Sequence, residues 1–97
     1  MFTYEKVLSV YAGMLSADED IEIVSSKNGY VGLVWDRDNC VLYDAEFLET
    51  PEAMKGFILS SYETLQHILL TKGKRKLTNK EAEKLFSTVE AMSDLCT

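Results

Sequence analysis

The sequence predicts one α+β domain spanning residues 1–97, with a three-stranded antiparallel sheet, helices packed on it and the order αβββαα. Apolar residues recur at three-to-four spacing near both ends of the chain, which is typical of amphipathic helices. Short runs rich in β-branched and aromatic residues, separated by turn residues, occupy 21–44. Two helix starts are recognisable, at Thr50-Pro51 and at Thr78. A chain of this length supports a single core.

The first helix is expected over residues 3–16. Thr3 can cap its start, and the run Asp18 to Asp20 ends it. One face of this helix carries Tyr4, Val7, Leu8, Tyr11, Met14 and Leu15.

Three strands should follow. The first runs over about 21–26, and Asn28-Gly29 is a favoured two-residue hairpin turn, which would place Val24 opposite Leu33. The second strand ends near Asp36. A polar turn at 36–39 then leads to a third strand from Cys40 to about Asp44.

Alternation along the strands leaves neither face of the sheet polar, although a sheet with one buried face should alternate clearly. We therefore expect helices on both faces, with the Trp35 side the better covered. The alternative is that one apolar face meets a partner outside the chain. One face would carry Ile21, Ile23, Tyr30, Val34, Val41 and Tyr43, and the other Val24, Val31, Leu33, Trp35, Cys40 and Leu42.

The third predicted helix begins with Thr50 as its cap and Pro51 in its first position, and it runs to residue 71. Gly73 follows its C-terminus. Its apolar stripe comprises Met54, Ile58, Tyr62, Leu65 and Leu69, flanked by Phe57 and Ile68, whereas Leu59 and Leu70 fall off it.

The last predicted helix starts at a capping box formed by Thr78 and Glu81. Its pattern turns Ala82, Leu85, Phe86, Val89, Met92 and Cys96 inward.

Charge is distributed unevenly along the chain, whose net charge is −6. Residues 1–71 contain twelve acids and four bases, whereas residues 72–97 contain four acids and six bases. Affinity for phosphates comes from basic side chains, so direct binding of nucleic acid by the bulk of the domain is disfavoured. A basic protein partner is favoured instead.

Acidic residues gather at the predicted turns and strand ends. A surface of spaced carboxylates resembles a phosphate track and could occupy a basic groove built for nucleic acid. The simpler interpretation is that these charges only keep the domain soluble. The candidate partner-binding residues are Asp18, Glu19, Asp20, Glu22, Asp36, Asp38, Asp44, Glu46 and Glu49.

No catalytic, cofactor or metal signature accompanies these charges. His67 is the only histidine and lacks a nucleophile motif beside it, and the glycines form no phosphate-binding loop. Cys40 and Cys96 are too far apart for a zinc motif and are expected to be free thiols. The basic run at 72–76 could dock on phosphate, but complementing the preceding helix dipole is the simpler interpretation.

We expect no enzyme activity, no cofactor and no membrane association. The chain has no apolar run long enough for a spanning helix and no signal-peptide pattern at its start. A cytoplasmic location is therefore expected.

In its αβββαα order, small size and acidity the chain resembles the anti-CRISPR proteins that block a CRISPR effector nuclease by mimicking DNA. It is also similar to small uncharacterised accessory proteins of Gram-positive mobile elements. The second likeness rests on Tyr4-Glu5, Val7, Gly29-Tyr30, Trp35-Asp36, Thr50-Pro51-Glu52-Ala53, Thr71-Lys72-Gly73 and Leu77-Thr78.

Together these features favour a non-enzymatic interaction module that inhibits or regulates a basic nucleic-acid-binding protein. The alternative is a homodimeric structural or accessory protein of a mobile element with no nucleic-acid-related target, held together by the second apolar sheet face or by Leu59 and Leu70.

Overall fold

The computed structural model describes residues 2–36 and 38–96 and confirms an α+β fold whose order corresponds roughly to αβββαα. The predicted turn at 36–39 includes Arg37, which lies outside the described residues. The elements are α1 (Tyr4–Val10), α2 (Ala12–Ala17), β1 (Ile21–Ser26), β2 (Gly29–Asp36), β3 (Val41–Leu48), α3 (Pro51–Thr71) and α4 (Asn79–Asp94).

The first predicted helix is divided into α1 and α2. The Thr3 side chain accepts a hydrogen bond from the Lys6 N–H at 3.1 Å, as expected of a cap. Tyr11 leaves the helical conformation, with φ −103° and ψ 17°. Its ring is buried, and its hydroxyl donates to the Met92 carbonyl at 2.7 Å. Packing against α4 thus accompanies the break that the periodicity alone did not predict.

The strands form one antiparallel sheet in the order β1-β2-β3, but the predicted hairpin register was wrong by two residues. Val24 lies opposite Val31 instead of Leu33. The Ser26 hydroxyl accepts from the Asn28 N–H and donates to the Gly29 carbonyl, so the turn closes over residues 27 and 28. A shift of two residues keeps every side chain on its predicted face.

The third strand is longer than predicted and contains a β-bulge. Val34 pairs with Asp44 but Trp35 pairs with Leu42, so Tyr43 is the extra residue. A bulge bends the strand and re-aims its side chains. Cys40 precedes the strand in a left-handed conformation, with φ 54°.

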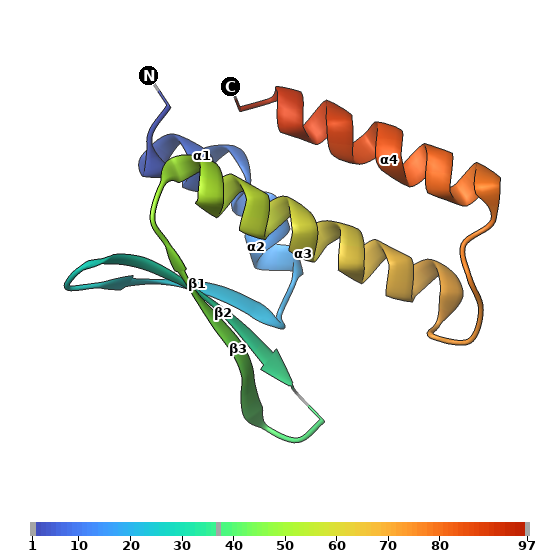
Figure 1. Cartoon of the computed structure of the whole chain (residues 1–97), viewed down its shortest axis with the longest axis horizontal. Helices are drawn as coiled ribbons and strands as arrows, with labels where there is room; N and C mark the ends of the chain where they lie inside the picture. Colours follow the sequence, from blue (N-terminus) through green and yellow to red (C-terminus); the bar gives the residue numbers. More distant parts are fainter. Residues whose placement is uncertain (1, 37, 97) are drawn as a thin grey trace.

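Helices cover only one face of the sheet, with α3 between the sheet and α4 (Figure 1). The expectation that helices cover both faces, with the Trp35 side better covered, was wrong. Ile21, Ile23, Tyr30 and Val34 pack against the core, whereas Trp35 remains 38% exposed. The fully or nearly buried core residues are Val7, Tyr11, Leu48, Met54, Phe57, Ile58, Leu59, Leu85 and Cys96.

Both later helices start at the predicted caps. Thr50 accepts from the Ala53 N–H at 3.0 Å, and Thr78 forms the reciprocal capping box with Glu81. Lys72 caps the C-terminus of α3 in a left-handed conformation, followed by Gly73 with φ 70°.

Several residues of the predicted apolar faces were wrongly placed inside. Leu69 is 59% exposed and Phe86 is 66% exposed, and Ala82 is also exposed. Helix α3 has 21 residues and is therefore about 32 Å long, so its C-terminal half continues past the region where α1 and the sheet pack (Figure 1). Leu59, predicted off the stripe, is buried instead.

The molecule is less compact than a typical domain of its length. Its radius of gyration is 14.1 Å, compared with about 12.5 Å expected for 97 residues. This difference agrees with the open space between the sheet and the C-terminal half of α3.

Candidate functional site

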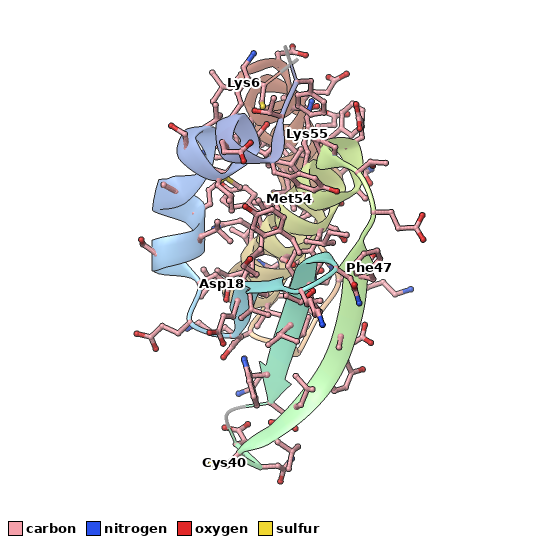
Figure 2. The ribbon with its side chains drawn as sticks, turned by 90° about the vertical axis from the view of Figure 1, so that its left-hand side faces the viewer. Lys6, Asp18, Cys40, Phe47, Met54 and Lys55 are labelled. Carbon is pink, nitrogen blue, oxygen red and sulfur yellow. The ribbon has the colours of Figure 1, made fainter. Side chains whose placement is uncertain are left out.

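A groove of about 900 Å³ separates α3 from the far half of the sheet. Its volume falls at the upper end of the range of about 300–1,000 Å³ that is usual for binding sites. Figure 2 shows Asp18 where the chain enters the sheet and Cys40 at the far end of the β2-β3 hairpin, away from the helices. The groove lies along this part of the sheet.

The groove gathers six of the nine predicted partner-binding residues, drawn from three separate segments of the chain. They come from the turn before β1, from the end of β2 with its following turn, and from β3. They are Asp18, Asp20, Asp36, Asp38, Asp44 and Glu46, and we call them the acidic rim.

Asp18 and Asp20 are fixed by the turn that joins α2 to β1. The Asp18 side chain is 8% exposed, and its Oδ1 accepts a hydrogen bond from the Asp20 N–H at 3.0 Å. The Asp20 carbonyl accepts from the Trp35 N–H at 2.7 Å, which ties this turn to β2. These contacts hold the turn against the end of the sheet.

Asp36 is fixed by the turn that follows β2. Its carboxylate accepts from the Asn39 side chain at 2.7 Å and from the N–H groups of Asp38 and Asn39. The hydrogen bond from the Asn39 side chain is the main cause of a lowered Asp36 pKa. Asp36 therefore keeps its negative charge at neutral pH.

The bulge in β3 brings an aromatic ring to the groove beside two acids. Two residues, Tyr43 and Asp44, occupy the space opposite Val34, so both line the groove. Tyr43 is 76% exposed, and Asp44 and Glu46 are also exposed. This edge of the groove offers charge and apolar surface together.

The opposite wall belongs to one face of α3. Small side chains lie along its middle, while Phe57, Leu65 and Ile68 provide apolar surface, of which Ile68 is 52% exposed. The small residues are Ala53, Gly56, Ser60, Ser61 and Thr64.

No lysine, arginine or histidine lines the groove among residues 2–36 and 38–96. Three predicted partner-binding residues lie outside it. Glu22 points to the uncovered sheet face, where it accepts from the Trp35 indole N–H at 3.2 Å. Glu19 and Glu49 are exposed but do not line the groove. Most of the predicted acidic residues thus gather at the groove, and three of them lie elsewhere on the surface.

The uncovered face of the sheet is a second exposed surface. Glu22 and Ser26 on β1 are polar, and most of the other residues on this face are apolar and lie side by side through the pairing of the strands. We call this set the open sheet face: Val24, Val31, Leu33, Trp35, Leu42 and Phe47.

The remaining candidate residues are the single histidine and the two cysteines. His67 is exposed, Cys40 is exposed and Cys96 is buried. Within the part of the chain that the structure describes, no group of three metal-ligating side chains comes together. None of the described helices is long and apolar enough to cross a membrane.

The basic linker between α3 and α4 is partly engaged within the domain. Arg75 donates to the Leu70 carbonyl at 3.0 Å, near the C-terminus of α3, as the dipole interpretation predicted. It also forms two hydrogen bonds with the Glu81 carboxylate, at 2.7 and 3.0 Å.

Reasoning from the sequence missed the apolar part of the groove. Tyr43 was assigned to the correct face without the bulge that exposes it, and Ile68 was taken as core. Small residues recurring along α3 at three-to-four spacing beside the apolar stripe were a signal that could have indicated the wall.

Comparison of the chain with protein-family models, curated proteins and solved structures found no match. The fold and the groove define the chain as an acidic α+β domain with an open groove. Its resemblances to anti-CRISPR proteins and to accessory proteins of mobile elements stay predictions.

Proposed function

We propose that this chain is a non-enzymatic interaction module of the cytoplasm that binds a basic protein through the acidic rim. The observation that carries the proposal is the meeting of six carboxylates at one groove whose described lining contains no basic side chain. Opposite charges attract over about 8–10 Å at ordinary ionic strength, which speeds the encounter and selects the partner.

A nucleic-acid-binding protein is the favoured class of partner. Such proteins expose grooves of lysine and arginine built to neutralise phosphates, and duplex DNA presents about one charge per 1.7 Å of its axis. Carboxylates held at turns and on β3 offer a comparable spaced set of charges. Occupation of the basic groove by this domain would exclude the nucleic acid, so the domain would act as an inhibitor or regulator.

Competition for a basic DNA-binding domain tests the proposal. A fluorescent duplex oligonucleotide is bound to each of several basic DNA-binding domains, and its release by this chain is followed by anisotropy at rising salt. We expect release at low salt from at least one domain, weakening as salt rises.

A charge-matched pair of triple variants locates the contact. Asp38→Asn, Asp44→Asn and Glu46→Gln alter the rim, whereas Glu63→Gln, Glu83→Gln and Glu90→Gln alter exposed acids outside the groove. At about 0.2–1 kcal/mol for each exposed pair, the rim variant should compete about 3- to 100-fold less well. Equal loss in both variants, or no competition by the unaltered chain, would refute the proposal.

Homodimerisation is the second candidate function, and the open sheet face is the observation that favours it. Exposed contiguous apolar surface of this kind commonly marks an interaction site. Leu59 does not contribute, because it is buried, although Leu70 is exposed. Sedimentation equilibrium with Phe47→Lys as the disrupting variant tests this candidate. A monomer at high micromolar concentration in the unaltered chain would exclude it.

A further inference from the structure

We infer that the element of the partner that enters the groove is an amphipathic α-helix with lysine and arginine along both flanks of a small, apolar face. This inference rests on the proposed function and specifies which structure the basic partner offers. Shape, hydrogen bonding and charge each support it.

The wall formed by α3 has the shape that a packed helix requires. Its groove-lining residues recur at three-to-four spacing from Ala53 to Ile68, which is one face about 22 Å long, or about four turns. Small residues along this face let a second helix approach closely, since helix axes pack about 8–10 Å apart depending on the side chains between them.

The wall of the groove that is formed by the sheet is covered by none of the described helices. Near α1 the helix-covered face of the sheet is closed by Leu48 and the core, whereas Tyr43, Asp44 and Glu46 on the same sheet remain exposed. Sheets commonly bury such a face beneath helices. A helix beside α3 would complete the layer over this half.

Hydrogen bonding favours a helix over an extended segment. Both walls consist of side chains, on one face of α3 and on one face of the sheet. The free N–H and C=O groups of the edge strand β3 lie in the plane of the sheet and do not point into the space above its face. An extended segment would bury its own N–H and C=O groups there without partners, which is unfavourable. A helix satisfies these groups internally.

The charges then fix the composition of the helix. Carboxylates lie on the sheet side at Asp44 and Glu46 and at the β1 end at Asp18 and Asp20. Lysine and arginine can lay their apolar stems along the walls while their charged ends reach the rim. Ile68 and Tyr43 would contact the apolar face of the partner helix, which lies between its two basic flanks.

A designed peptide provides a direct probe. It has about 16 residues, with alanine and leucine on one helical face and lysine and arginine on both flanks. A control peptide has the same composition in an order that destroys the two faces. Binding is measured by fluorescence anisotropy, and helix formation by circular dichroism. We expect the designed peptide to bind about tenfold more tightly than the control and to become helical on binding.

Two serine variants test whether the peptide lies in the groove. Ser60→Trp fills the middle of the α3 wall, and Ser87→Trp places the same side chain on the exposed surface of α4. Ser60→Trp should weaken binding about tenfold or more, and Ser87→Trp less than about twofold. Thr64→Trp, one turn along the wall, is the second groove variant, so the test does not depend on one substitution folding correctly.

Failure of the helix inference is distinguishable from failure of the proposed function. Equal affinity of the two peptides, no binding by either peptide, or no effect of both groove variants would overturn the inference that a helix enters the groove. If the triple rim variant still displaces the oligonucleotide from the DNA-binding domain less well than the unaltered chain does, the proposed function stands. If the rim variant competes normally, the proposed function also fails.

Discussion

The Phe57 ring lies directly against the backbone of Gly32, so that a methyl group at Gly32 would come within 2.8 Å of ring carbons Cε2 and Cζ. Phe57 belongs to α3 and Gly32 to the central strand, and both are buried. This contact sets how closely α3 approaches the sheet. It also lies where the core ends and the groove begins, because Phe57 lines both.

Gly32→Ala should therefore destabilise the domain. The added methyl group has to displace a buried ring or separate α3 from the sheet, at about 1–3 kcal/mol of unfolding free energy. Urea denaturation measures this change. Gly13→Ala is the control, because open space surrounds that position and alanine should stabilise the helix there by about 0.5–1 kcal/mol. Equal stability of the two variants would contradict the role of the contact.

Tyr11→Phe should lower the unfolding free energy by about 1 kcal/mol, since it removes the hydroxyl that donates to the Met92 carbonyl. Tyr43→Phe, at an exposed ring, should have little effect. Burial is the main cause of a Tyr11 pKa raised above 10.0. Because the unfolded chain ionises first, the unaltered domain should lose stability above pH 10, and Tyr11→Phe should remove part of that loss.

The capping box of α4 should respond to acid. Hydrogen bonds from the Arg75 side chain and the Thr78 N–H lower the Glu81 pKa from 4.5 to about 2. A lowered pKa means that the contribution of Glu81 to stability is present above pH 4.5 and is lost as the pH falls toward 2.

Carbon-13 NMR of the Glu81 carboxyl group measures this pKa directly. Arg75→Gln should raise it toward 4.5, whereas Lys74→Gln, with the same change of charge in the same linker, should leave it near its value in the unaltered chain. An unchanged pKa in Arg75→Gln would show that the capping contact with Thr78 acts alone.

Adjacent residues of α4 should differ sharply in their tolerance of truncation. Leu85 is buried, so Leu85→Ala should cost about 2–5 kcal/mol. Phe86 is 66% exposed, and Phe86→Ala should change stability by about 0.5 kcal/mol or less. Thermal denaturation compares the two variants. A large loss in Phe86→Ala would place that ring inside, as the periodicity of the sequence predicted.

Local signals in the sequence predicted the helix starts well. Thr50 with Pro51, and Thr78 with Glu81, form their caps from residues within one turn, so distant contacts are not needed. The hairpin register was less secure. Asn28-Gly29 is a favoured turn, yet the hydroxyl of Ser26 closes a different one.

The acidic rim was only partly predictable. The sequence indicated that carboxylates gather at turns, and six of those nine residues meet at the groove. Alternation along β1 also places Glu22 on the face opposite Ile21 and Ile23, away from the groove, but the position of the groove itself could not be read from the sequence. The bulge at Tyr43 arises from how β3 pairs with β2. No pattern within the sequence of β3 specifies that pairing.

The sequence by itself determined the element types, the caps and the uneven charge, since these depend on neighbours within a few residues. Only the tertiary structure decided which sheet face is covered, where α1 breaks and which carboxylates share a groove. Those outcomes follow from packing between distant segments, such as Phe57 on Gly32 and Tyr11 on α4. An apolar pattern shows that a face can be buried, but the available neighbours decide whether it is.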